Sequence, residues 1–118
     1  MKILTIGDVV GEAGLDALHA LLRRIKRDTG ADFVIVNGEN AAGNGVLPRQ
    51  AEDIFDAGAD VVTLGNHAFG KQQIVPYLDE HSDILRPANL APQSPGQGWG
   101  IFDGPQGSRL LVIDLIGR

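Results

Sequence analysis

Two patterns of apolar residues alternate along the chain. Unbroken apolar runs predict buried strands, and they lie at residues 1–6, 32–37, 60–64 and 84–85. Between these runs, apolar residues recur every three or four positions, which predicts amphipathic helices at 15–29, 48–57 and 71–80. Because strands alternate with helices, we expect βαβ units, an α/β fold and a mostly parallel sheet.

Glycine and proline mark the ends of several predicted elements. Gly30 and Gly58 are expected C-caps, and Pro48 is expected at the first position of the second helix. A segment broken by prolines, 86–95, separates the fourth strand from the last apolar runs. Those runs, 98–103 and 109–115, predict a hairpin that turns at Gly-Pro-Gln-Gly.

The chain of 118 residues has the size of one domain, so we expect 1–118 to form a single unit. Its last apolar strand is followed only by Gly117 and Arg118, so no later segment of this sequence can cover it. We therefore expect the chain to be a fragment of a longer protein or its fold to be completed by a partner, either a second copy of the chain or a different polypeptide.

The composition excludes several classes of function. The sequence has 10 Lys and Arg against 15 Asp and Glu, a net charge of −5, and few aromatic residues. Because nucleic-acid surfaces need basic and stacking side chains, we expect no stable nucleic-acid complex. The lack of cysteine excludes disulfides, thiolate metal sites and a cysteine nucleophile. No apolar run is long enough to span a membrane and no secretory signal begins the sequence, so we expect a cytoplasmic protein.

Each of the first three predicted strands ends in a glycine that is followed by polar residues. These segments are Gly7-Asp8, Gly38-Glu39-Asn40 and Gly65-Asn66-His67. The carboxyl ends of neighbouring parallel strands lie at one edge of a sheet, where ligands bind. If the three strands are neighbours, Asp8, Glu39 and Asn66 converge there. Two carboxylates at one edge repel unless one is protonated or a cation lies between them, and oxygen ligands suit Mg²⁺, Mn²⁺ or Fe²⁺.

These residues also have a purely structural interpretation. Asp8 and Glu39 can act as turn or cap residues, and a single His67 is commonly a structural hydrogen-bonding group. The repetition of polar residue types at three equivalent strand ends favours a functional site instead. His19 and His81 lie within or beside predicted helices, and we expect surface or packing roles for both.

The order and spacing of several motifs resemble a known family. The motifs are GDVVG, GENAAGNG, TLGNH, LRPAN, PGQGWG and LIGR, and together they extend over essentially the whole chain. They resemble the YmdB-like branch of the calcineurin-type metallophosphoesterases. The resemblance implies the N-terminal βαβαβ half of a calcineurin-like α/β/β/α sandwich, with a C-terminal hairpin. It also implies a dinuclear centre of Fe, Mn or Mg that hydrolyses phosphodiesters, with cyclic nucleotides among the substrates.

The resemblance assigns roles to the polar residues at the strand ends. Asp8 would bind the first metal ion, with Asn40 beside it. Glu39 would bridge the two ions, Asn66 would bind the second, and His67 would contact the phosphate or protonate the leaving oxygen. These residue types suit the chemistry, because two cations about 3.5–4 Å apart clamp a phosphate and neutralise its developing charge. An imidazole can donate a proton near neutral pH.

The same resemblance implies that the site is incomplete in this chain. Members of the family are about twice as long, and their second half supplies a histidine and a Gly-x-His-x-His motif as metal ligands. Neither occurs here. Activity would need the missing half in the same polypeptide or a partner chain that supplies the ligands, which makes a homo-oligomer or a complex with a partner the expected state.

Two other functions stay open at this point. One is a dinucleotide-binding half-domain, since Gly7, Gly11 and Gly14 lie in a glycine-rich turn and Glu39 could hold a ribose hydroxyl. The spacing G-x-x-x-G-x-x-G differs from G-x-G-x-x-G, however, and Asp8 would place a negative charge beside the pyrophosphate. The other is a non-catalytic assembly module derived from the same family, whose exposed sheet edge pairs with another copy or a larger partner.

Overall fold

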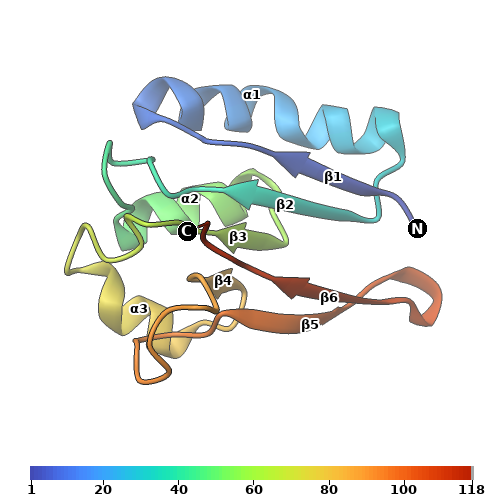
Figure 1. Cartoon of the computed structure of the whole chain (residues 1–118). Helices are drawn as coiled ribbons and strands as arrows, with labels where there is room; N and C mark the ends of the chain where they lie inside the picture. Colours follow the sequence, from blue (N-terminus) through green and yellow to red (C-terminus); the bar gives the residue numbers. More distant parts are fainter. Residues whose placement is uncertain (118) are drawn as a thin grey trace.

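The computed structural model describes residues 1–117 and contains a four-stranded parallel sheet. Its strands are β1 (Ile3–Ile6), β2 (Phe33–Asn37), β3 (Val61–Thr63) and β4 (Ile84–Leu85). They lie in the order β1-β2-β3-β4, so each strand pairs with the next one along the chain (Figure 1). The predicted α/β class is confirmed, and the first three strands are neighbours, as the convergence of their ends requires.

Three helices follow the first three strands: α1 (Gly11–Thr29), α2 (Pro48–Ala57) and α3 (Ile74–Glu80). Gly30 and Gly58 cap α1 and α2 with φ values of 71° and 126°, which confirms both predicted caps. Helix α1 begins at Gly11, four residues earlier than predicted, and α3 begins three residues later than predicted, since residues 71–73 form a tight turn. In that turn the N–H groups of Ile74 and Val75 donate to carbonyl oxygens three residues earlier. None of the helices within 1–117 is long and apolar enough to cross a membrane.

The parallel sheet separates two hydrophobic clusters. On one face, the three helices pack against the strands in a cluster that includes Leu22, Ile54 and Leu78. On the other face lies a hairpin of β5 (Trp99–Asp103) and β6 (Arg109–Ile113), which turns at Pro105–Gly107 (Figure 1). This second cluster joins three strand residues, Ile35, Val61 and Leu85, to three hairpin residues, Phe102, Leu110 and Val112. The predicted hairpin and its turn are confirmed.

The outward face of the hairpin is apolar and exposed. Five large apolar side chains there are at least half exposed: Trp99, Ile101, Leu111, Ile113 and Leu115. Trp99 lies opposite Ile113, and Ile101 lies opposite Leu111, so four of the five form cross-strand pairs on one face. The hairpin is thus apolar on both faces, which is typical of a sheet that is covered on both sides.

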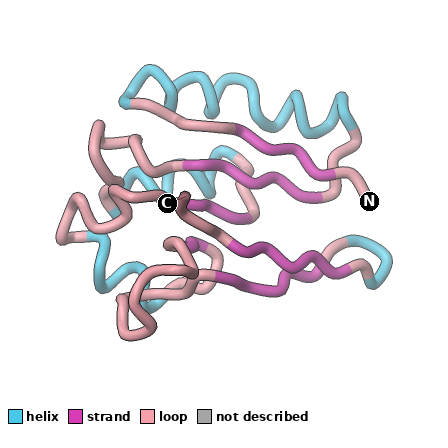
Figure 2. The backbone as a smooth tube through the Cα atoms, viewed as in Figure 1, coloured by secondary structure: helices cyan, strands magenta, loops and turns pink. Residues whose placement is uncertain are grey.

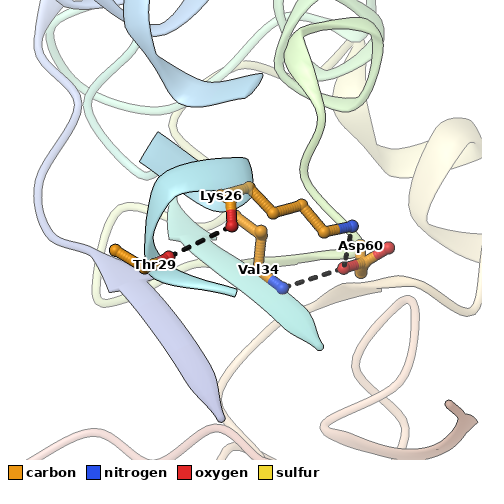
Figure 3. A network of polar contacts seen from close by, with 4 residues as sticks. All are labelled: Lys26, Thr29, Val34 and Asp60. Atoms are coloured by element: carbon orange, nitrogen blue, oxygen red, sulfur yellow. Dashed lines mark hydrogen bonds and ion pairs between the residues drawn. The ribbon is translucent and has the colours of Figure 1, made fainter. Parts of the chain in front are cut away.

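Polar contacts join α1 to the strands at the amino end of the sheet. Asp60, just before β3, accepts a hydrogen bond at 2.8 Å from the N–H of Val34, and the same carboxylate oxygen lies 4.0 Å from Lys26 Nζ (Figure 3). Thr29 Oγ1 donates to the Lys26 carbonyl oxygen at 3.2 Å. These contacts fix the end of the sheet opposite the strand ends that carry the candidate site residues.

Candidate metal centre

The loops that follow β1, β2 and β3 lie together at one end of the parallel sheet (Figure 2). Backbone hydrogen bonds continue beyond the strands and join neighbouring loops. The N–H of Val9 donates to the Asn37 carbonyl oxygen at 3.0 Å, and the N–H of Gly38 donates to the Thr63 carbonyl oxygen at 3.0 Å. The three loops that hold the candidate residues are therefore fixed relative to one another by the main chain.

Asp8 and Asn40 form the first of two polar pairs. Asn40 Nδ2 donates to Asp8 Oδ1 at 2.7 Å, from the loop after β2 to the loop after β1. Asp8 has a φ of 40°, a left-handed backbone conformation that is costly for a residue with a side chain. Such strain persists where the surrounding structure enforces it, and it is frequent at functional sites. The turn places an exposed carboxylate beside a carboxamide.

Glu39 and His67 form the second pair, which is less accessible. The His67 backbone N–H donates to Glu39 Oε2 at 2.9 Å, and His67 Nδ1 lies 3.0 Å from the same oxygen. The Glu39 side chain is 13% exposed, whereas the His67 side chain is 44% exposed. Nδ1 itself is buried and, within the described part of the chain, has no aligned hydrogen-bond partner. An imidazole nitrogen beside a carboxylate oxygen is a donor pair that suits a divalent metal ion.

Gly65 and Asn66 belong to the same loop as His67. The Glu39 carboxylate lies against Gly65, in the space that a larger side chain at residue 65 would occupy. Asn66 is exposed, and its side chain makes no hydrogen bond to any residue among 1–117. Of the five candidate residues, four therefore form two pairs, and Asn66 shares only a loop with the second pair.

The two pairs and Asn66 bring together side chains of the types that bind divalent metal ions. Among residues 1–117, no group of three or more His, Asp and Glu side chains lies close enough together to hold a metal ion. The available donors are two carboxylates, two carboxamides and one imidazole, a set that fits Mg²⁺, Mn²⁺ or Fe²⁺. Because such ions take about six ligands, each ion held here would need further ligands from solvent, substrate or another polypeptide.

A further carboxylate, Asp114, lies behind the third loop. It follows β6, is only 9% exposed, and accepts a hydrogen bond at 3.0 Å from the N–H of Leu64. Burial raises the pKa of Asp114 from 3.8 to about 6; the Leu64 hydrogen bond opposes this shift, and the charge of Glu39 adds to it. Sequence analysis missed this residue. The available signal was one acidic residue inside the apolar run LLVIDLI.

Comparison with known proteins identifies the family. The family described as YmdB-like protein matches residues 4–118, which is nearly the whole sequence. The chain belongs to the YmdB-like family. It is 39% identical over 119 residues to a Bacillus subtilis (strain 168) protein named 2',3'-cyclic-nucleotide 2'-phosphodiesterase. That alignment covers 100% of this chain and 45% of the relative.

Two solved structures resemble this YmdB-like chain. A hypothetical protein from Thermus thermophilus matches with a TM-score of 0.91 and 38% identity, over 100% of this chain and 46% of its own. A protein described as a novel phosphatase from Mycoplasma pneumoniae matches with a TM-score of 0.88 and 29% identity, over 99% of this chain and 43% of its own. These matches confirm the predicted fold class.

The YmdB-like chain spans less than half the length of the relatives that it matches. The match falls on their N-terminal half, as the resemblance of the motifs implies. Of these relatives, one is named a phosphodiesterase and one a phosphatase, and neither name mentions a dinucleotide.

Proposed function

We propose that this chain carries the first part of a dinuclear metal centre that hydrolyses small phosphodiesters, such as cyclic nucleotides. The main support is the arrangement at adjacent strand ends, where Asp8 contacts Asn40 and Glu39 contacts His67. Family membership supports the same conclusion, because the relative from Bacillus subtilis is named a 2',3'-cyclic-nucleotide 2'-phosphodiesterase.

Each candidate residue has a role in this proposal. Asp8 and Asn40 would hold one divalent cation, Asn66 would hold a second, and Glu39 would be a ligand to both. Two bound cations supply positive charge that stabilises the negative charge developing on the phosphate. Because His67 Nδ1 is buried against Glu39 while the ring is 44% exposed, the outer edge of the ring is available to a substrate. From there His67 donates a proton to the leaving oxygen.

The site needs ligands beyond those in the described residues, and the exposed hairpin face is the surface where another polypeptide would bind. We infer that the occupant is a polypeptide equivalent to the part of the relatives that this chain does not span. The apolar face ends at Leu115, next to Asp114, which contacts the third loop through Leu64. A polypeptide that covers this face is therefore close enough to the site to add ligands to it.

The exposed hairpin face also supports a second candidate function, a non-catalytic assembly module. Two cross-strand apolar pairs, Trp99 with Ile113 and Ile101 with Leu111, are suited to self-association. In that case the chain associates with a second copy or a larger partner and holds no metal ion.

Calorimetric titration with Mn²⁺ tests the proposal and separates the two candidates. The wild-type chain is compared with Glu39→Gln and with a control, Glu80→Gln, at an exposed position at the end of α3. We expect wild type and Glu80→Gln to bind alike, and Glu39→Gln to bind Mn²⁺ more than about tenfold more weakly. Unchanged affinity in Glu39→Gln contradicts the dinuclear site. Association of the wild type without Mn²⁺ binding favours the assembly module.

A further inference from the structure

Asp114 connects three segments at the junction between the hairpin and the parallel sheet. Its backbone N–H donates to the Gly98 carbonyl oxygen at 3.0 Å, and its carbonyl oxygen accepts from the N–H of Ala88 at 2.7 Å. Its carboxylate Oδ2 accepts from the N–H of Leu64 at 3.0 Å, across 50 residues of sequence. The two backbone hydrogen bonds join Asp114 to residues 88 and 98, which lie between β4 and β5. Only the carboxylate contacts the segment after β3 that carries Asn66 and His67.

The carboxylate is not needed to satisfy the backbone N–H of Leu64, the residue that follows β3. The N–H of Leu64 also donates to the Leu85 carbonyl oxygen at 2.9 Å, so the parallel ladder already provides it with an acceptor. Among the described residues, no Lys, Arg or His forms an ion pair with Asp114, which is only 9% exposed. The Asp114 carboxylate shares its donor, the Leu64 N–H, with the Leu85 carbonyl oxygen. Burying a carboxylate with so little compensation lowers the stability of the fold, so stability does not explain why an aspartate lies here.

A short series of contacts leads from Asp114 to the candidate site. Leu64 precedes Gly65, and Gly65 lies directly against the Glu39 carboxylate. Two residues further along the loop, the His67 N–H donates to Glu39 Oε2 at 2.9 Å. A displacement of Leu64 would therefore move both groups that contact Glu39, because the peptide chain between residues 64 and 67 is short and packed.

We propose that Asp114 is a positioning residue for the candidate metal centre: its carboxylate holds Leu64, and thereby fixes Gly65 and His67 against Glu39. This role rests on the proposed function, in which Glu39 bridges the metal ions. Asp114 does not touch substrate or metal in this scheme. Its effect is to keep Glu39 and His67 in the arrangement that the site requires.

Amide hydrogen exchange, measured by NMR on the metal-free chain, tests this role. In Asp114→Ala the His67 amide should exchange about tenfold faster, which corresponds to the loss of a hydrogen bond to a charged group. Asp114→Asn should restore slow exchange, because its carboxamide oxygen can still accept from Leu64. Asp103→Ala, an exposed position on the same hairpin, should leave the His67 amide unchanged. If Asp114→Ala does not fold, Asp114→Leu takes its place, since it keeps the side-chain volume and removes the acceptor.

A merely structural role of Asp114 gives a different result. If the carboxylate only attaches the hairpin, its loss speeds exchange at Ala88 and at Asp114 itself and leaves His67 protected, which overturns the inference. Failure of Asp114→Asn to restore protection of His67 also overturns it. Mn²⁺ titration separates this result from the proposed function: equal Mn²⁺ affinities of the wild type and Glu39→Gln contradict the metal centre, while the exchange of His67 still decides the positioning role.

Discussion

Glu39 Oε1 occupies the space that a Cβ atom on Gly65 would need. Glu39 belongs to the loop after β2, and Gly65 belongs to the loop after β3. In the same place, the His67 N–H donates to the other oxygen of the Glu39 carboxylate, Oε2. Glycine is required at residue 65 because Glu39 fills the space beside it. The need for glycine at residue 65 therefore comes from Glu39, a side chain in the loop that follows the neighbouring strand.

Substitution of Gly65 by alanine should disturb the metal centre directly. We expect Gly65→Ala to displace the Glu39 carboxylate and to weaken Mn²⁺ binding by about tenfold or more. Gly7→Ala is the matched control, since it also follows a strand, and a Cβ atom there has no neighbour within 4 Å. Calorimetric titration of both variants gives the comparison. Equal Mn²⁺ affinities would show that the observed position of Glu39 is not needed for binding.

The raised pKa of Asp114 predicts a pH dependence of stability. Because its pKa is about 6 in the folded chain and 3.8 ordinarily, the folded state binds more protons between these values. The free energy of unfolding should therefore fall as the pH rises from about 4 to 6, by about 2 kcal/mol from this group alone. Asp114→Asn removes the titrating group and should be more stable than wild type at pH 7.

Urea unfolding at pH 4 and pH 7 measures this effect. The difference in stability between Asp114→Asn and wild type should grow with pH across this range. Asp103→Asn serves as the control for the change in net charge, because that side chain is exposed on the same hairpin. A constant difference between Asp114→Asn and wild type at both pH values would contradict a raised pKa.

Removal of His67 should separate catalysis from metal binding. When His67→Ala is made in the chain together with the polypeptide that completes the site, we expect hydrolysis of a 2',3'-cyclic nucleotide at saturating Mn²⁺ to fall by roughly a hundredfold or more, because the proton donor is lost. Mn²⁺ affinity should change less, since the carboxylates and carboxamides remain. His19→Ala is the control, at an exposed position within α1. Equal hydrolysis rates for the two variants would exclude His67 as the acid.

The exposed hairpin face should determine association. Ile113→Asp places a charge at the centre of this face, where the wild-type side chain is 54% exposed. We expect it to reduce self-association in sedimentation velocity while changing stability by less than about 1 kcal/mol. Val112→Asp, at the adjacent inward position, should instead destabilise the fold by about 3 kcal/mol. If the wild type stays monomeric at high concentration and its single tryptophan, Trp99, remains exposed to solvent, the chain does not self-associate. A different polypeptide would then have to cover the exposed hairpin face.

Local sequence patterns were sufficient to predict most of the fold. The apolar runs located the strands, and Gly30, Gly58 and Pro48 located helix ends, because capping and backbone conformation depend on residues close in sequence. The predicted start of α3 was wrong by three residues, since the turn at 71–73 is stabilised by hydrogen bonds that no apolar pattern reveals.

The candidate site was only partly predictable from the sequence. The repetition of glycine and polar residues at three strand ends indicated which loops converge, and the sheet order confirms that they do. Which side chains pair could not be deduced, because the Asp8–Asn40 and Glu39–His67 contacts span 32 and 28 residues. Asp114 was missed for the same reason: its partner, Leu64, lies 50 residues away.

The strand order has a consequence for how the site is built during synthesis. Each polar pair joins loops of consecutive strands, so both members of the first pair lie within residues 1–40, and both members of the second lie within residues 1–67. Since chains emerge from the ribosome N-terminus first, both pairs can form before the hairpin has been translated. Asp114 arrives last, and it fastens a loop whose contacts with its neighbours have already been made.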